Sequence, residues 1–511
     1  MSLPNSNKRI AKNTLILYFR MFVLMAINLF TSRVILQTLG VSDYGVYNAV
    51  GGIVAMFGIL SGVLTTSIMR FITFELGRGD YKRLNHVFST SLNAMFALST
   101  LVILLGEVIG VWFLNAEMNI PAGRMTAANW VFQCSIITFI INLVSVPYNA
   151  CIVAHEKMSA FAYVSILDAF LKLAIVFLVS FLPTDKLISY AVFLTIIATI
   201  IRLVYGIYCK RNFEECTYHF VYDKALLRSI TSFAGWTICG RSAGILSSHG
   251  VTLLINLFFG VTVNAARGIS LQVSTTIQHF VSNFTMALNP QITKSYAVGD
   301  FKTMHSLIFR GAKISYFLML YAGIPVLCEA PLLLHLWLGI VPPEHTINFI
   351  RLTIVGSMIA TVNGTLITGL HASGDIRNYM IIVGLVGLSI IPLTFIGFRL
   401  YPIPELSYFI TLTIYLFDMF LRVYLIKDKI KMKGRDYCRY VFLPIALVSI
   451  PSFLIPVGFC FFCSDSVFRL LEICVISFIS TSISIYLFGL EKNEKAKIKN
   501  VVVEFVRCVK K

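Results

Sequence analysis

The chain has 511 residues, of which 57% are hydrophobic and 13% charged, and its mean hydropathy is +0.81. A water-soluble protein of this length needs far more polar surface to cover its core, so the composition excludes a soluble globular protein. The net charge of +18 does not indicate nucleic-acid binding, because the basic residues are dispersed among the segments that join apolar runs.

Apolar runs follow one another along the chain, and each is long enough to cross a hydrocarbon layer of about 30 Å as a helix. The short alternating segments of a β-barrel are absent from the sequence. We therefore predict an all-α polytopic membrane protein with about fourteen transmembrane helices. The first run follows three basic residues but is too long for a signal peptide, so we expect it to be retained. The predicted spans are 13–38, 46–73, 86–114, 127–150, 159–181, 187–208, 229–259, 263–293, 307–330, 348–371, 379–399, 406–426, 440–462 and 468–490.

Lys and Arg are distributed unevenly between the two sets of connecting segments. Most of them lie in the N-terminus, 75–85, 155–158, 209–228, 294–310, 375–378, 427–439 and the C-terminal tail. The opposite set holds only Arg124, Lys186, Arg399 and Arg469. Because cytoplasmic segments carry the excess of basic residues, both termini are predicted to be cytoplasmic.

The sequence repeats itself at an offset of 220 residues. Gly40-Val41-Ser42 corresponds to Gly260-Val261-Thr262, and Gly79-Asp80 corresponds to Gly299-Asp300 at the same offset. Because each repeat holds an even number of helices, both copies cross the membrane in the same sense, about a pseudo-twofold axis along the membrane normal. The predicted domains are two six-helix bundles at 1–215 and 216–435, an appended helix pair at 436–490 and a basic cytoplasmic tail at 491–511.

Basic residues within the spans outnumber acidic ones, and several lie among other polar residues. A polar stripe at that depth cannot face lipid, so it lines a wet cavity or packs tightly. Guanidinium groups suit a phosphate because their planar donors bind it bidentately. Snorkelling at helix ends, close packing of the small residues nearby, and hydrogen-bonded core histidines are alternatives that stay open. The candidate substrate-binding residues are Arg20, Asn28, Arg70, Arg241, His249, Arg267, Gln278, His279 and Asn283.

The acidic residues of the spans allow two interpretations. Asp168 and Lys172 are four residues apart, as are Asp418 and Arg422, so each pair shares one helix face. Either pair forms a structural ion pair or takes part in H⁺ or Na⁺ coupling. Glu107 belongs to the same group of candidates, and together with Glu329 is otherwise expected at the membrane interface. No catalytic grouping, metal cluster or cofactor motif is recognisable, so neither an enzyme nor a cofactor is predicted.

Two matched runs carry a resemblance to a known family. The first extends from Leu39-Gly40-Val41-Ser42-Asp43-Tyr44-Gly45 to Gly79-Asp80 and includes Thr65-Thr66-Ser67-Ile68-Met69-Arg70-Phe71. The second extends from Gly260 to Gly299-Asp300 and includes Asn289-Pro290-Gln291-Ile292. In these features the chain resembles polysaccharide flippases of the Wzx type, whose superfamily also contains the MATE carriers and the lipid II flippase MurJ. Two helices beyond the first twelve also resemble flippases more than MATE carriers.

The resemblance implies a rocker-switch carrier of the bacterial inner membrane for surface polysaccharide, lipopolysaccharide and O-antigen export. It would move undecaprenyl-diphosphate-linked oligosaccharide units from the cytoplasmic to the periplasmic leaflet. Arg20, Arg70 and Arg267 would then meet the pyrophosphate, and the partners would be the lipid-linked substrate, membrane lipids and polysaccharide assembly proteins. A MATE-like cation-coupled multidrug exporter is the alternative, although such carriers need buried carboxylates. An integral-membrane polysaccharide polymerase or ligase would need a larger outer loop.

Overall fold

The computed structural model describes residues 3–55, 57–116, 118, 120, 122–220, 223–338, 343–462, 467–491 and 494–495. Every regular element within these ranges is helical. Twelve helical segments of the described chain are long and apolar enough to cross a membrane. The predicted all-α polytopic membrane fold is therefore confirmed. The predicted basic tail at 491–511 lies almost wholly outside the described residues.

Contacts between helices divide the chain into two compact units. Unit 1 comprises residues 1–238 and 293–299, and unit 2 comprises residues 239–292 and 300–511. This division assigns 216–238 to the first unit and the appended helices to the second. The domain boundaries expected from the sequence repeat, at residues 215 and 435, stay a prediction.

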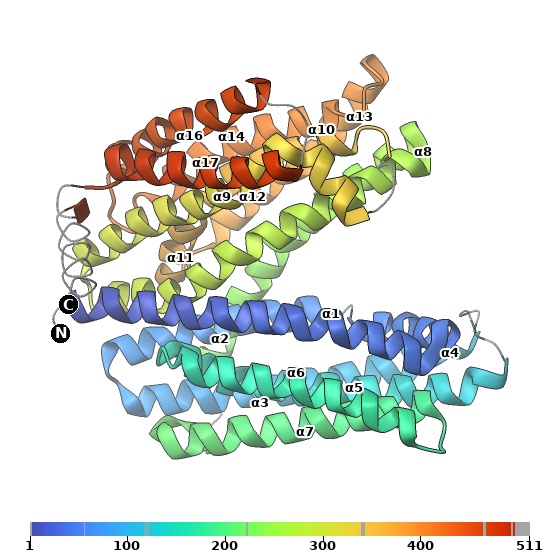
Figure 1. Ribbon diagram of the computed structural model, residues 1–511. Helices are drawn as coiled ribbons and strands as arrows, with labels where there is room; N and C mark the ends of the chain where they lie inside the picture. The colour runs from blue at the N-terminus through green and yellow to red at the C-terminus, as the bar shows by residue number, and fades with distance from the viewer. Residues whose placement is uncertain are drawn as a thin grey trace, which may run out of the picture. The chain divides into compact units, whose positions relative to one another are not determined.

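Unit 1 is a bundle in which α1 to α7 run side by side (Figure 1). Its helices are α1 (Leu3–Ala55), α2 (Gly58–Arg78), α3 (Tyr81–Leu105), α4 (Val111–Ala116), α5 (Met125–Ala154), α6 (Met158–Phe181) and α7 (Lys186–Asn212). A π-helical turn at Gly106–Gly110 joins α3 to α4, and 3₁₀ turns occur at Ala122–Arg124 and Glu214–Cys216. Helix α5 contacts α1, α2, α3, α6 and α7, so it is the central helix of the unit.

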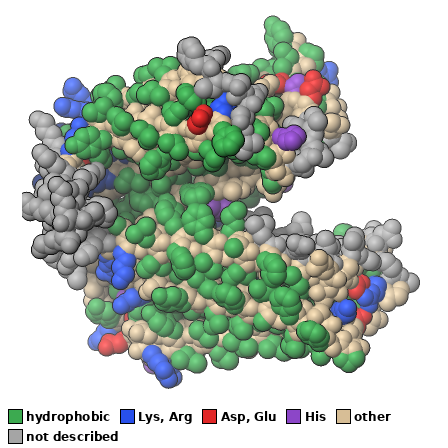
Figure 2. All heavy atoms as spheres, viewed as in Figure 1, with side chains coloured by type: hydrophobic (Ala, Val, Ile, Leu, Met, Phe, Trp, Pro, Cys, Tyr) green, Lys and Arg blue, Asp and Glu red, His purple; other side chains and the backbone are tan. Residues whose placement is uncertain are grey.

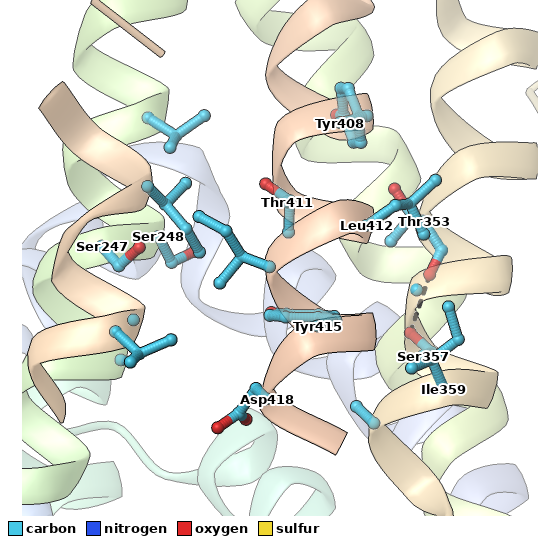
Figure 3. A pocket seen from close by; sticks show the side chains of 18 of the residues that line it. Ser247, Ser248, Thr353, Ser357, Ile359, Tyr408, Thr411, Leu412, Tyr415 and Asp418 are labelled. Atoms are coloured by element: carbon cyan, nitrogen blue, oxygen red, sulfur yellow. Dashed lines mark hydrogen bonds between the residues drawn. The ribbon is translucent and has the colours of Figure 1, made fainter. Parts of the chain in front are cut away.

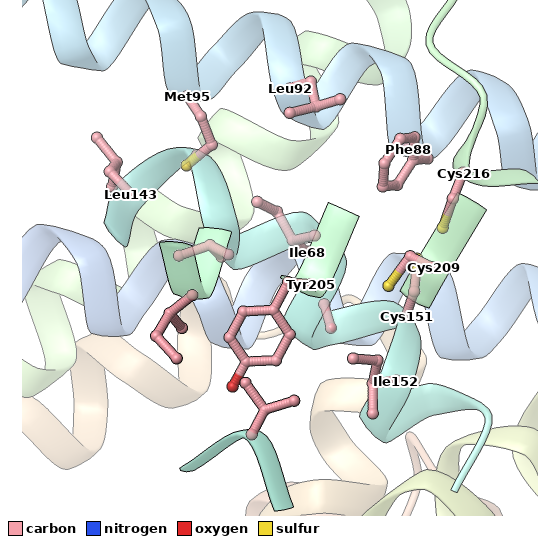
Figure 4. Close-up of a cluster of buried hydrophobic side chains, with 14 of the residues drawn as sticks. Ile68, Phe88, Leu92, Met95, Leu143, Cys151, Ile152, Tyr205, Cys209 and Cys216 are labelled. Atoms are coloured by element: carbon pink, nitrogen blue, oxygen red, sulfur yellow. The ribbon is translucent and has the colours of Figure 1, made fainter. Parts of the chain in front are cut away.

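The core of unit 1 consists of apolar side chains from several helices that meet around α5. Ile68 of α2, Phe88 of α3 and Leu143 of α5 are each fully buried, and Figure 4 shows them with their neighbours. Such side chains repeat at helical spacing, which places them on one face of each helix. Interdigitation of these faces excludes lipid from the interior of the unit.

Unit 2 contains the middle of α8 (Lys224–Ala297) and all the later helices. These are α9 (Phe301–Leu338), α10 (Thr346–Thr361), α11 (Gly364–Ser373), α12 (Arg377–Leu388), α13 (Ile390–Leu400), α14 (Leu406–Ile426), α15 (Gly434–Tyr437), α16 (Leu443–Phe462) and α17 (Val467–Ser484). π-Helical turns occur at Cys438–Phe442 and Ile485–Gly489. Helix α9 contacts α10 and α11 as well as the appended helices α16 and α17, and α14 contacts α10, α12 and α13.

Two of the fourteen predicted spans are helical but are not among the twelve apolar segments. The span predicted at 46–73 is divided between the end of α1 and the start of α2. The span predicted at 263–293 is the part of α8 that follows Gly260. Its Gln, Asn, Ser and Thr residues lower its mean hydropathy, so composition alone does not mark it as a span.

Glycines 220 residues apart have matching backbone conformations. Gly40 interrupts α1 with φ 78° and ψ 167°, and Gly260 interrupts α8 with φ 82° and ψ −175°. Only glycine populates this region readily, so each long helix bends sharply there. Gly79 and Gly299 share a φ of 75° at the ends of α2 and α8. The two halves of the chain thus share their helix joints.

Hydrophobic side chains cover the visible lateral faces of the helices, while basic and acidic side chains gather towards helix ends (Figure 2). On α6, for example, Phe170 and Phe177 are 52% and 44% exposed. A soluble protein rarely exposes so much contiguous apolar surface, whereas a bilayer solvates it. The surface therefore agrees with a multi-pass membrane protein.

The appended helices of unit 2 are attached to α9 by buried polar contacts. The Nε of Arg469 on α17 lies 2.7 Å from Oε1 of Glu329 on α9, and Glu329 is only 1% exposed. The Nζ of Lys313, also on α9, donates to the carbonyl oxygen of Gly489 at 3.1 Å. Helix α17 covers Glu329 and supplies its counter-charge, and its predicted place at the membrane interface stays a prediction.

Candidate functional site

Unit 2 contains a cavity of about 350 Å³ that is lined by both polar and apolar side chains. Its walls come from α8, α10, α12, α13 and α14. In Figure 3, serines of α8 face the aromatic and polar side chains of α14, with α10 on the other side. The polar and charged lining residues include Ser247, Ser248, Arg267, Ser274, Gln278, Thr353, Ser357, Asn363, Tyr408, Thr411, Tyr415, Asp418 and Arg422.

Helical spacing accounts for how these residues share one space. Arg267, Ser274 and Gln278 lie seven and four residues apart on α8, which keeps them on one face of the helix. Tyr408, Tyr415 and their polar neighbours repeat in the same way along α14. The break at Gly260 divides α8 into two segments, and both segments contribute to the cavity wall.

Arg267 is the principal charged group of the cavity. It is 7% exposed, its Nε donates to Oγ1 of Thr252 at 3.0 Å, and its Nη2 donates to the carbonyl oxygen of Ser248 at 3.3 Å. The guanidinium carbon lies 5.5 Å from the ring centroid of Tyr408, within the range of a cation–π contact. Both hydrogen-bond acceptors are neutral, so the positive charge of Arg267 is not cancelled by them.

Asp418 and Arg422 form an ion pair on α14. The Nε of Arg422 lies 2.5 Å from Oδ2 of Asp418, as their four-residue spacing predicts. Oδ1 of Asp418 and Oδ1 of Asn363 are both buried and have no hydrogen-bond partner among the described residues. The pair therefore neutralises one arginine, and two buried acceptor oxygens of residues that line the cavity have no donor among the described residues. Whether it also takes part in ion coupling stays a prediction.

Buried carboxylates in the described part of the chain are all ion-paired. The six are Asp43 with Arg124, Glu75 with Arg83, Glu156 with Arg9 and Lys294, Glu215 with His155, Glu329 with Arg469, and Asp418 with Arg422. Arg267, by contrast, forms no ion pair with any carboxylate among the described residues. A buried charge without a counter-ion is costly, so a group of this kind in a membrane span indicates function.

The unit 1 candidates lie outside this cavity. The guanidinium carbon of Arg20 on α1 lies 4.6 Å from the ring centroid of Phe161, and that of Arg70 on α2 lies 4.5 Å from the centroid of Phe71. Asn28 is exposed on α1. Each of the two arginines thus contacts at least one aromatic ring, and their predicted contact with pyrophosphate stays a prediction.

The polar residues predicted along α8 do not all line the cavity. Gln278 lines the cavity and donates to Oγ of Ser357 at 3.1 Å, whereas Arg241, His249 and His279 are exposed and do not line it. Asn283 is buried, and its Nδ2 donates to the carbonyl oxygen of His279 at 2.9 Å. Polar residues at helical spacing spread around a helix of this length, so only part of the stripe meets the cavity.

The remaining candidates are placed at the periphery of unit 1. Asp168 and Lys172 form an ion pair of 2.7 Å on α6, and the side chain of Lys172 is 46% exposed. Glu107 is exposed in the π-helical turn after α3.

The glycines of the first segment of α8 divide between packing and cavity lining. A Cβ at Gly240 would lie 2.5 Å from the sulfur of Met380, and one at Gly250 would lie 2.7 Å from Cδ1 of Ile391. These two glycines therefore allow α12 and α13 to pack closely, as their small-residue spacing suggested. Gly244 has open space beside it and lines the cavity.

Of the residues that line the cavity on α14, only Asp418 and Arg422 were predicted from the sequence, and the contribution of α10 was not predicted. Ser357, Asn363, Tyr408 and Tyr415 all line it. Each interrupts an apolar run, which is a signal that could have marked them as candidates. Nothing in the local sequence, however, says which face of α10 or α14 meets α8.

Comparison with known proteins identifies the fold. No model of a known protein family matches the chain. An uncharacterized membrane protein of Bacillus subtilis, EpsK, is 18% identical over 313 residues, so the match spans 60% of this chain and 60% of that relative.

Solved structures match over more of the chain. A MATE structure in the bent conformation has a TM-score of 0.72 at 12% identity, covering 83% of this chain and 96% of that one. An outward-facing multidrug resistance MATE transporter of the MOP superfamily has a TM-score of 0.70 at 12% identity, with 84% and 96% covered. A MOP-superfamily transporter of Pyrococcus furiosus, described as having a binding pocket of reversed polarity, has a TM-score of 0.64 at 13% identity, with 83% and 96% covered. This chain therefore has the fold of the MATE transporters.

Proposed function

We propose that this protein is a flippase that moves undecaprenyl-diphosphate-linked oligosaccharide units from the cytoplasmic to the periplasmic leaflet of a bacterial inner membrane. It works by alternating access, with both termini cytoplasmic, and serves the export of a surface polysaccharide of the O-antigen type. The fold supports a membrane transporter, because the solved structures that share it are MATE transporters. The nature of the cargo is argued from the charges of the helices.

One observation carries the choice of an anionic cargo. The buried carboxylates of the described chain are paired with basic groups, whereas Arg267 is buried in a cavity and has only neutral acceptors. A carrier of cations needs a carboxylate that is free to bind them, and a carrier of anions needs a free cationic donor. In the cavity the carboxylate of Asp418 is paired with Arg422, whereas Arg267 has no carboxylate partner among the described residues.

A MATE-like cation-coupled multidrug exporter is the second candidate. It is supported by the fold and by the carboxylate of Asp418, which lines the cavity. In that case Asp418 would have to release Arg422 when a cation binds. The two candidates therefore differ in which of Arg267 and Asp418 meets the cargo.

The two candidates are separated by transport in proteoliposomes. Purified protein is reconstituted, and the transfer of a diphosphate-linked oligosaccharide lipid between leaflets is compared with the uptake of a cationic dye. We expect movement of the lipid and none of the dye and, where the oligosaccharide carries a hexuronate, Arg267→Gln to slow the lipid at least about tenfold because it removes a charge-assisted hydrogen bond. Arg399→Gln, which removes an exposed arginine of α13, is the matched control. Dye uptake that is lost in Asp418→Asn and kept in Arg267→Gln would favour the exporter.

Complementation of a flippase-null strain tests the biological role. Mass spectrometry of the accumulated lipid intermediates identifies the oligosaccharide that the protein moves. Restored surface polysaccharide with wild-type protein, and accumulated intermediates with Arg267→Gln at equal protein levels, are the expected results. Restoration by Arg267→Gln would remove Arg267 from the substrate path.

A further inference from the structure

We propose that the cavity of unit 2 binds a sugar ring that carries a carboxylate, and that it does not bind the diphosphate of the lipid carrier. This inference rests on the proposed function, since it assigns a part of the cargo to a particular site. The cavity measures about 350 Å³, which lies in the range of small-molecule sites that enclose most of their ligand.

The hydrogen-bonding groups of the cavity match a polyol. Oγ of Ser274 and Oγ of Ser357 lie 2.7 Å apart, and Nε2 of Gln278 donates to both at 3.1 Å. Hydroxyl groups both donate and accept, so this group can exchange hydrogen bonds with the hydroxyls of a sugar. A wall of this kind selects a ligand that has many hydroxyls.

Two unsatisfied acceptors of residues that line the cavity disfavour a ligand that has acceptors alone. Oδ1 of Asn363 and Oδ1 of Asp418 are buried without a hydrogen-bond partner among the described residues, and both residues line the cavity. Buried acceptors of this kind require a donor. Sugar hydroxyls supply donors, whereas an ionised diphosphate has only acceptor oxygens.

The charge of the cavity matches a single carboxylate. Of its two arginines, Arg422 is paired with Asp418, so one positive charge remains on Arg267. A carboxylate carries one negative charge and fits the planar guanidinium bidentately. A diphosphate would bring an excess of negative charge into a buried space, which is unfavourable. A metal cation is disfavoured by Arg267, and no group of three or more metal-binding side chains occurs among the described residues.

Aromatic side chains of the cavity also suit a sugar ring. Tyr408 and Tyr415 of α14 both project into the cavity (Figure 3). Their rings offer apolar surface with a polar tip, which suits a ligand that has both C–H faces and hydroxyl edges. Tyr408 also contacts Arg267, so the aromatic surface and the cationic donor lie next to each other.

The first test measures binding to the full-length protein in nanodiscs by calorimetry. The probes are glucuronate, glucose and inorganic pyrophosphate. We expect glucuronate to bind more tightly than glucose, and Arg267→Gln to weaken glucuronate at least about tenfold, with Arg399→Gln unchanged. Absence of glucuronate binding, unchanged glucuronate binding in Arg267→Gln, or pyrophosphate binding that depends on Arg267 would each overturn the inference.

The second test separates this inference from the proposed function. Proteoliposomes are supplied with two diphosphate-linked oligosaccharide lipids that differ only in whether one ring is a hexose or the corresponding hexuronate. We expect Arg267→Gln to slow the hexuronate lipid at least about tenfold and the hexose lipid much less. An equal loss for both lipids would assign Arg267 to the diphosphate and overturn the inference while leaving the flippase intact. If wild-type protein moves neither lipid, the proposed function fails. The calorimetric titration with glucuronate then still tests whether the cavity binds a carboxylate-bearing sugar.

Discussion

The two units have different interiors at positions that correspond in the repeat. Subtracting 220 from the number of a cavity residue in unit 2 usually gives an apolar residue in unit 1. The corresponding pairs include Arg267 and Tyr47, Ser274 and Val54, Ser357 and Ile137, Asn363 and Leu143, and Asp418 and Ala198. The same helix joints thus enclose a polar cavity in one unit and apolar side chains in the other.

Several of the corresponding unit 1 positions are packed among apolar side chains. Val54 is 5% exposed and belongs to a cluster of buried apolar residues that includes Val50 and Val131. Tyr47 packs against Tyr190 with ring centroids 5.2 Å apart. The two interiors therefore differ in the side chains at corresponding positions of the repeat, and a shared fold does not imply a shared site.

A second difference between the units concerns the burial of two glutamates, Glu107 and Glu329. Glu107 in unit 1 is exposed, whereas Glu329 in the related part of unit 2 is buried against α17. The appended helices cover only the second of these carboxylates. Glu329 is therefore part of the buried interior of unit 2 because the appended helices α16 and α17 pack against α9.

The largest predicted effect comes from the ion pair that attaches α17. Glu329→Ala leaves Arg469 buried without its counter-charge and should lower the free energy of unfolding by about 3–5 kcal/mol. Thermal unfolding in detergent measures the loss, and Glu472→Ala, an exposed change on α17, is the control. A loss no greater than that of the control would mean that α17 does not depend on this pair.

An exchange of repeat partners should give the next largest effect. Val54→Ser places a hydroxyl in the apolar cluster of unit 1 and should cost about 2 kcal/mol of stability. Ser274→Val makes the reverse change beside a cavity, so it should cost little stability and should slow transport instead. Chemical denaturation and the proteoliposome assay together measure both variants. Equal destabilisation by the two exchanges would show that both interiors are equally packed.

The smallest predicted effect is a pH dependence that the two units share. Burial alone raises the pKa of Asp185, but hydrogen bonds from the Ile188 amide and Arg124 outweigh it and hold the pKa below its ordinary value. Burial likewise raises the pKa of Glu405, and hydrogen bonds from Asn348 and His345 lower it further than burial raises it.

A carboxyl whose pKa is lowered by folding stabilises the protein above its ordinary pKa and ceases to do so as the pH falls through the lowered value. Acidification below about pH 4 should therefore destabilise both units. In Asp185→Asn and in Glu405→Gln, the loss of unfolding free energy between pH 6 and the acid range should be smaller than in wild type, by less than about 1 kcal/mol each. Chemical denaturation at the two pH values measures the loss. If a variant loses as much stability on acidification as wild type, the replaced carboxylate does not cause the pH dependence.

Local features of the sequence accounted for the helices and their joints. The long apolar runs required membrane helices, and Gly40 and Gly260 bend the chain where the repeat placed them. The four-residue spacing of Asp418 and Arg422 was sufficient to predict that they touch. These predictions succeeded because helical periodicity and glycine stereochemistry depend on residues that are close along the chain.

Other predictions needed information that local sequence does not hold. Arg267 and Gln278 reach the cavity and His279 does not, although all three lie on one polar helix. The partner of Glu329 lies 140 residues away on α17, and the acceptors Asn363 and Asp418 come from different helices. Periodicity defines the faces of each helix, but the packing of helices against one another decides which face a cavity, a neighbour or lipid will cover. The sequence by itself determined a membrane-spanning helical chain whose spans carry more basic than acidic residues. The tertiary structure decided that Arg267 is buried without a carboxylate partner among the described residues, because its neighbours come from helices that are distant in the sequence.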